Sequence, residues 1–208
     1  MIYYRIESTG NENLCVRGTK PLGILRPGGY AEYVLVPSPR YLAKTNADLV
    51  KTAPMACAGI TAYNAVKKAE PSPGDVIMII GVGGLGHIAI QIARKLYGTQ
   101  IIAVDIRDEA LKLVETLGTD YIINPSKADV QEEVRKITGG IGVDAAIDFV
   151  GVGETFSKAL KALKRGWETY GSGARRGIHK HSSSPPTPQK YRDPRVICRI
   201  VERSRGNG

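Results

Sequence analysis

Three glycines at fixed spacing constrain the fold of this chain more than any other feature of its sequence. Gly81, Gly83 and Gly86 lie in GVGGLGHIAIQIA, directly after the apolar run VIMII at 76–80 and before apolar residues repeated at helical spacing. The run is typical of a buried strand, and the glycines predict a sharp turn from that strand into a helix. Because units of this kind build parallel sheets, we expect an α/β fold.

Short apolar runs and helical stretches alternate from residue 71 to residue 166. Strands are expected at 76–80, 101–105, 121–123 and 144–149, and helices at 85–97, 108–117, 129–138 and 154–165. Each helix is expected to end at a glycine, the residue that most easily adopts a left-handed C-cap: Gly98, Gly118, Gly139 and Gly166. The strands lack strict alternation of apolar and polar residues, which indicates helices on both faces. Residues 71–166 therefore predict strands 1–4 of a doubly wound parallel (Rossmann) sheet.

The glycine turn also has the pattern of a dinucleotide-binding site. Gly81 permits the tight turn, Gly83 lets the backbone approach a pyrophosphate, and Gly86 lets the helix pack close to the strand. Free amides and the positive end of the helix dipole would face the phosphates. The candidate cofactor-binding residues of the turn are Gly81, Val82, Gly83, Gly84, Leu85 and Gly86. Glycines that serve close packing alone, without a ligand, remain the alternative.

Residues near the ends of the second and fourth strands extend this candidate site. Asp105 would accept hydrogen bonds from the ribose hydroxyls and repel a 2′-phosphate, which favours NAD over NADP, and the charge of Arg107 softens that preference. Val150 and Gly151 follow the fourth strand and are candidates for the nicotinamide end, although an ordinary turn explains them equally well. His87 is interpreted as a first-turn helix residue rather than a catalytic base.

Residues 1–70 have a different pattern and are interpreted as part of a second domain with connecting helices. The stretch GGYAEYVLVP at 28–37 predicts a strand that ends at prolines. Helices are expected at 46–53, with Asn46 as N-cap, and at 55–69. The three cysteines, Cys15, Cys57 and Cys198, are far apart and form no C-x-x-C pair, which argues against both a disulfide framework and a self-contained zinc cluster.

The net charge of +9 is concentrated in the last part of the chain. Residues 167–208 carry a net charge of +6, which leaves +3 for residues 1–166. Nucleic-acid binding is not favoured, because this basic tail lacks aromatic residues interleaved for base stacking. No apolar run approaches the ~20 residues of a membrane span, so we expect a cytoplasmic protein without a membrane partner.

Several stretches, in order, resemble the zinc-dependent medium-chain alcohol dehydrogenases, and archaeal members in particular. They are GNENLC (10–15), GGYAEYVLVP (28–37), APMACAGITAYNAV (53–66), GVGGLGHIAIQIA (81–93) and VDAAIDFVG (143–151). The resemblance implies that residues 1–70 are a remnant of a GroES-like, β-rich catalytic domain. It also implies hydride transfer between NAD and an alcohol, aldehyde or ketone, and a homo-oligomer whose interface would lie in a sixth strand that this chain lacks.

The resemblance further implies two zinc sites. Cys57 matches one ligand of the catalytic zinc, whose other two ligands would precede the first residue of this chain. Cys15 matches the last of four cysteines around a structural zinc, but the other three are missing or replaced, so Cys15 is interpreted as a spare thiol. We therefore expect a chain that belongs to the enzyme family yet does not turn over.

Residues 167–208 depart from the family pattern, which places a fifth strand after Gly166. A disordered tail is one explanation. A one-nucleotide frame error is the other, because codons for 165–173 and 191–199 can be chosen so that the frame one base forward reads as the fifth and sixth strands. Either explanation predicts that the strand at 144–149 is an unpaired apolar edge, with poor solubility and weak cofactor binding.

Three other functions are weighed beside the dehydrogenase. A dinucleotide-binding module without catalysis would bind NADH but produce none from alcohol. A zinc-free quinone reductase would share the fold, although Cys57 in its ligand-like context argues against it. A nucleic-acid arm would show salt-dependent DNA binding.

Overall fold

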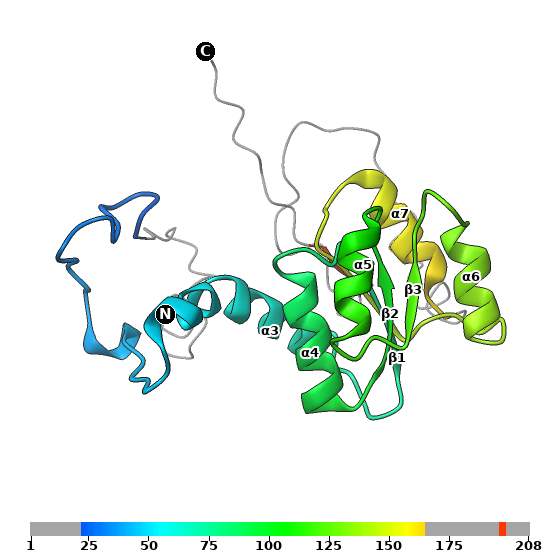
Figure 1. The fold of residues 1–208 in the computed structure, drawn as a ribbon, viewed down its shortest axis with the longest axis horizontal. Coiled ribbons are helices and arrows are strands. Elements are labelled where there is room, and N and C mark those ends of the chain that lie inside the picture. The colour runs from blue at the N-terminus through cyan, green and yellow to red at the C-terminus, as the bar shows by residue number, and fades with distance from the viewer. Residues whose placement is uncertain (1–21, 165–195, 199–208) are drawn as a thin grey trace, which may run out of the picture. The chain divides into compact units, whose positions relative to one another are not determined.

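The computed structural model describes residues 22–164 and 196–198 of the 208-residue chain. The chain divides into two compact units, Met1–Ala47 and Asp48–Gly208. The second unit contains a parallel sheet with strand order β3-β2-β1-β4-β5 (Figure 1). The strands are β1 (Val76–Ile80), β2 (Gln100–Val104), β3 (Tyr121–Ile123), β4 (Ala145–Asp148) and β5 (Val196–Cys198). The expected doubly wound α/β fold is confirmed.

The described helices follow the expected alternation with strands. They are η2 (Pro39–Tyr41), α2 (Leu49–Thr52), η3 (Ala53–Ala56), α3 (Ala58–Lys68), α4 (Gly86–Tyr97), α5 (Asp108–Glu115), α6 (Val130–Ile137) and α7 (Gly153–Ala162). Gly98 ends α4 in the left-handed region with φ 64°, as expected. The prediction that Asn46 is the N-cap is wrong, because Asp48 caps α2 by accepting hydrogen bonds from the Val50 and Lys51 amides. The helix expected at 154–165 ends earlier, at Ala162.

Two apolar layers lie on opposite faces of the sheet. One contains the side chains of Ile77, Ile79, Ile101 and Ile147 and packs against α3, α4 and α5. The other contains those of Met78, Ile80, Ile102 and Ala146 and packs against α6 and α7. Helices thus cover both faces, which explains why the strand sequences are apolar throughout.

Two carboxylates hold the amino-terminal edge of the sheet. The Val76 amide, at the start of β1, donates a hydrogen bond to Asp144 Oδ2 at 2.8 Å. The Ile101 amide in β2 donates to Asp120 Oδ2, also at 2.8 Å. Asp120 is paired with Arg94 and Asp144 with Lys164, so each carboxylate joins a strand amide to a basic side chain. These contacts fix the edge opposite to the glycine turn.

The expectation that the fourth strand is an unpaired edge is wrong. β4 pairs in parallel with β5, with Ala146 opposite Val196 and Ile147 opposite Ile197. The tail sequence contains the β-branched pair Val196 and Ile197, and their backbone satisfies the outer hydrogen-bonding groups of β4. The expected fifth and sixth strands of the shifted frame, at 165–173 and 191–199, fall almost entirely outside the described residues, as do Gly166 and Cys15.

The strand expected at 28–37 is also wrong, since no residue of this segment lies in a strand. Tyr30, Tyr33 and Leu35 are exposed. A strand needs a neighbour to satisfy its backbone amides and carbonyls, and none is described within residues 22–47. The compact division after Ala47 falls before the expected boundary at residue 70, because α3 packs on α4 and belongs with the sheet.

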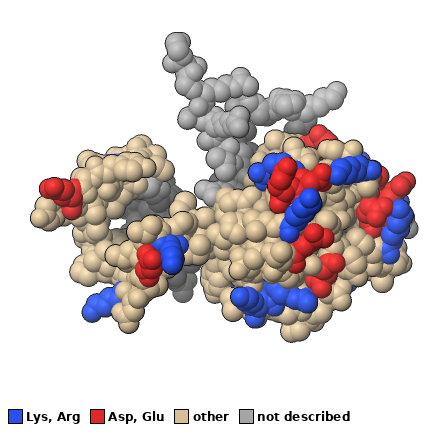
Figure 2. Space-filling view, in the orientation of Figure 1, with Lys and Arg blue, Asp and Glu red and all other residues tan. Residues whose placement is uncertain are grey.

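The described surface carries charges of both signs. In Figure 2, acidic and basic side chains are interspersed over the elements of the sheet unit on the face in view. Several of them form ion pairs, including Lys127 with Asp108 and Lys158 with Glu154. Among the described residues, no helix is both long enough and apolar enough to span a membrane.

Candidate functional site

The glycine turn joins the carboxyl end of β1 to the start of α4. Gly81 has a φ of 83°, in the left-handed region, and its amide donates to the Val104 carbonyl of β2 at 2.8 Å. Leu85 is the N-cap of α4 and has no hydrogen-bonding side chain, so the first-turn amides lack a side-chain cap. Uncapped amides at the positive end of a 12-residue helix favour an anion.

Close contacts at Gly81 and Gly86 leave no room for a side chain at either position. A Cβ at Gly86 would lie 2.2 Å from the Gly81 carbonyl oxygen, and a Cβ at Gly81 would lie 2.6 Å from Val150 Cγ2. Gly84, in contrast, has open space around it. The two outer glycines are therefore required by close packing, in the roles that the spacing predicts. The cradle that they leave fits the approach of a diphosphate.

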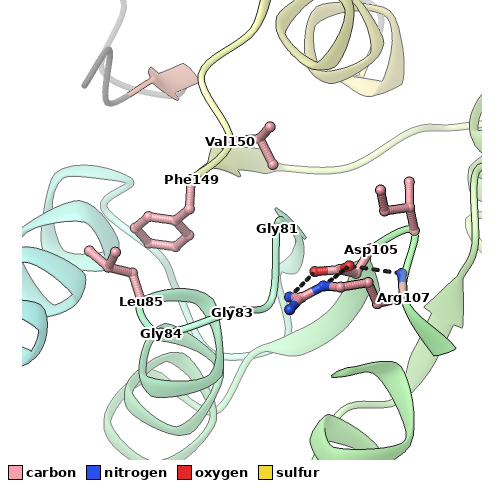
Figure 3. A pocket seen from close by; sticks show the side chains of 9 residues that line it. Gly81, Gly83, Gly84, Leu85, Asp105, Arg107, Phe149 and Val150 are labelled. Atoms are coloured by element: carbon pink, nitrogen blue, oxygen red, sulfur yellow. Dashed lines mark hydrogen bonds and ion pairs between the residues drawn. The ribbon is translucent and has the colours of Figure 1, made fainter. Parts of the chain in front are cut away.

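The buried carboxylate of Asp105 connects the end of β2 to the glycine turn. Its Oδ2 accepts a hydrogen bond from the Val82 amide at 3.0 Å, and its Oδ1 accepts one from the Arg107 amide at 2.9 Å. The Arg107 side chain adds Nε to Oδ1 and Nη2 to Oδ2, both at 3.2 Å (Figure 3). Burial raises the pKa of Asp105, but the contacts from Arg107 and Val82 together lower it below the ordinary 3.8. The group is a carboxylate at neutral pH.

A second buried carboxylate, Asp148, holds the turn after β4. Its Oδ1 accepts hydrogen bonds from the amides of Val150 at 2.8 Å and Gly151 at 3.1 Å. Its Oδ2 accepts one from the Thr155 hydroxyl of α7 at 2.6 Å. These contacts press Val150 against the glycine turn, and Gly151 accommodates the bend with a φ of 73°.

Side chains after β2 and β3 fix a third part of the site. Asn124 Nδ2 donates to the Ile106 carbonyl at 3.1 Å and to Asp108 Oδ1 at 2.8 Å. Lys127 pairs with the other oxygen of Asp108 at 2.6 Å, and these hydrogen bonds lower the pKa of Asp108. Ile106 is thereby held at the rim with its apolar side chain exposed.

These elements enclose a pocket of about 280 Å³ at the carboxyl edge of the sheet (Figure 3). It is lined by Gly81, Gly83, Gly84, Leu85, Asp105, Ile106, Arg107, Phe149 and Val150. Three residues expected from the sequence do not line the pocket: Val82, Gly86 and Gly151. They contact residues that hold its wall, namely Asp105, Gly81 and Asp148. His87 lies in the first turn of α4, with Nδ1 2.6 Å from the Gly83 carbonyl oxygen.

The described residues do not form a zinc site. Cys57 is exposed at the N-cap of α3, and no group of three or more His, Cys, Asp or Glu side chains lies together anywhere in 22–164. Zinc with one protein ligand does not have the three or four ligands found in protein zinc sites. The donor set of the described part therefore does not fit the metal that the resemblance implies.

Sequence reasoning missed three supporting residues: Asp148, Asn124 and Ile106. Asp148 and Asn124 stand at the carboxyl ends of β4 and β3, and Ile106 follows the end of β2. That position was a usable signal, because ligands of open parallel sheets bind outside these ends.

Comparison with known proteins places this geometry among the dehydrogenases. A family model described as "Zinc-binding dehydrogenase" matches residues 84–197. An NAD-dependent alcohol dehydrogenase of Sulfolobus acidocaldarius is 49% identical over 158 residues, which is 75% of this chain and 45% of that protein. An alcohol dehydrogenase of Geobacillus stearothermophilus is 42% identical over 160 residues, 76% of this chain and 46% of that protein. The chain thus spans less than half the length of the curated relatives it matches.

Solved structures of other dehydrogenases have a similar fold. The alcohol dehydrogenase of Aeropyrum pernix matches with a TM-score of 0.59 and 39% identity, over 69% of this chain and 43% of that one. The D-arabinose dehydrogenase of Sulfolobus solfataricus matches with a TM-score of 0.70 and 33% identity, over 77% of this chain and 51% of that one.

Proposed function

The chain belongs to the zinc-binding dehydrogenase family, and from this premise we propose that its pocket binds NAD as the cofactor domain of an NAD-dependent alcohol dehydrogenase. The reaction class is hydride transfer between NAD and an alcohol, aldehyde or ketone. When bound, NAD would accept the hydride. The alcohol dehydrogenases among the relatives support this assignment, and a homo-oligomer and a cytoplasmic location stay predictions.

The observation that carries the proposal is the hydrogen bond from the Val82 amide to Asp105. This contact joins a glycine turn suited to a diphosphate and a carboxylate suited to a ribose diol within one pocket. A dinucleotide needs both, separated by the length of the ribose-phosphate link. A turn that served packing alone would not need a buried acid directed at it.

The residues of this chain have separate roles in the proposal. The uncapped amides at the start of α4 bind the diphosphate, and Asp105 accepts hydrogen bonds from the adenosine ribose. Ile106 supplies an apolar surface for the adenine, while Phe149 and Val150 shield the other side of the pocket, toward the nicotinamide end. Asp148 positions that shield through the amides of the turn.

Zinc is not assigned to any step. The family implies it, but the donor set around Cys57 does not fit it in the described part, so Cys57 and Cys15 stay predictions from the resemblance. An alternative function is a dinucleotide-binding module without catalysis. The alcohol dehydrogenases among the relatives do not favour this alternative.

Calorimetric titration of the 208-residue chain with NADH tests the proposal. We expect saturable binding at one site, now that pairing with β5 removes the unpaired edge on which the expectation of weak binding rested. Production of NADH from a primary or secondary alcohol, with zinc present, then separates dehydrogenase from binding module. Absence of NADH binding by a folded chain would refute the cofactor assignment.

A further inference from the structure

The carboxylate of Asp105 is fully engaged within the chain. Each of its oxygens accepts one backbone amide, from Val82 or from Arg107, and one N–H of the Arg107 guanidinium. The two backbone donors keep the carboxylate oriented whatever the arginine side chain does. Only the two guanidinium contacts can be exchanged without disturbing the turn.

The guanidinium lies on the solvent side of this carboxylate. The Asp105 side chain is 6% exposed, whereas that of Arg107 is 58% exposed. A ligand that reaches Asp105 from the pocket must therefore take the place of the guanidinium. A ribose diol has two hydroxyl donors, the same number that the Nε and Nη2 atoms supply.

The guanidinium also lies above the glycine turn. Arg107 Nη2 would be 3.4 Å from a Cβ placed at Gly83, the glycine over which a diphosphate is expected to approach. A displaced guanidinium therefore remains within the phosphate-rich part of a bound dinucleotide. Charge-assisted contacts of arginine with phosphate are strong and frequently bidentate.

From this arrangement we propose that Arg107 is a specificity-determining residue that exchanges partners when the cofactor binds. With NAD, the ribose diol displaces the guanidinium from Asp105. With NADP, the 2′-phosphate binds the guanidinium, which offsets the repulsion from Asp105. Arg107 therefore narrows the preference for NAD over NADP that Asp105 alone would give. This inference rests on the proposed NAD-binding function and deepens it.

The substitution Arg107→Ala separates the two roles. The substitution removes the guanidinium that competes with the ribose for Asp105, and the ion pair that is lost is partly exposed. NADH should therefore bind to this variant as tightly as to the unmodified chain, or up to about fivefold more tightly. Because it removes the counter-charge of the 2′-phosphate, NADPH should bind roughly tenfold to hundredfold more weakly. Arg107→Lys retains the positive charge but not the planar set of N–H donors, and should restore most of the NADPH affinity.

Lys112→Ala is the matched control. It removes one positive charge from an exposed position in α5, with no contact to Asp105, and should shift both affinities by the same small factor. Calorimetry with NADH and NADPH on the four chains, after circular dichroism has established folding, gives the ratio of affinities. A change in that ratio with Arg107→Ala and its recovery with Arg107→Lys would support the exchange.

Two other results would overturn it, in distinguishable ways. If Arg107→Ala weakens NADH and NADPH equally, Arg107 is a general counter-charge, and the NAD-binding proposal stands without the exchange. If the unmodified chain and the Lys112→Ala control bind neither cofactor, the proposed function fails and the exchange fails with it.

Discussion

Replacing Gly86 with alanine would place a methyl group where the backbone of the glycine turn already lies. The added Cβ would be 2.2 Å from the Gly81 carbonyl oxygen, whereas ordinary contact begins at 3.4 Å, so turn and helix must separate by about 1.2 Å. The obstacle is backbone and cannot rotate away. The cost therefore falls near the top of the range for overpacking, about 3 kcal/mol, against a gain in helix propensity of at most about 1 kcal/mol.

A net loss of about 2–3 kcal/mol corresponds to a melting temperature roughly 4–12 °C lower for a chain of this size. Far-ultraviolet circular dichroism on heating measures it, with urea unfolding as the second method. Gly84→Ala is the control, because Gly84 has open space around it and lacks a left-handed φ, and it should change stability by less than about 0.5 kcal/mol. Equal melting temperatures for Gly86→Ala and the unmodified chain would refute the reasoning, as would an equal loss at Gly84.

Asp148→Ala removes the acceptor of two amides and the Thr155 hydroxyl in a buried place, and should cost about 3 kcal/mol in urea unfolding; Asp148→Asn, which keeps one oxygen acceptor, should cost less. The pKa of Asp105 is lowered in the folded chain, so its carboxylate stabilises the fold fully above pH 3.8, and this stabilisation is lost as the pH falls below that value through the folded pKa. Acid titration of Asp105→Asn should therefore lack this pH-dependent loss of stability. Cys57→Ser should leave zinc binding unchanged in equilibrium dialysis at micromolar zinc, and a clear loss of bound zinc would show that Cys57 lies in a metal site.

Most of the fold could be predicted because local sequence and tertiary packing agree. β1 and β3 have the predicted bounds, and Gly98 ends α4 because its left-handed φ suits the C-cap. Disagreement arises where a distant contact decides. α7 ends before its expected glycine because Leu163 is extended and bridges Val143, a contact that helical periodicity does not encode.

The candidate site divides in the same way. Gly81, Gly86 and Asp105 could be identified because spacing along one β-α-β unit fixes their geometry. The bidentate contact of Arg107 and the turn held by Asp148 depend on rotamers and on α7, which no single-strand pattern specifies. The prediction of a strand at 28–37 was wrong for the opposite reason: the alternation of side chains is present, but no neighbouring strand is described within residues 22–47.

The carboxylates of Asp120 and Asp144 give the two rims of the sheet different tasks. Hydrogen bonds to strand amides and ion pairs with basic side chains fix one rim, so the ion pair on the opposite rim can change while the strands stay in place. Engineering for another cofactor should therefore alter Ile106 or Arg107 and leave the amino-terminal rim, with Asp120 and Asp144, unchanged. Changes there would weaken the whole scaffold while leaving the preference for one nucleotide over another untouched.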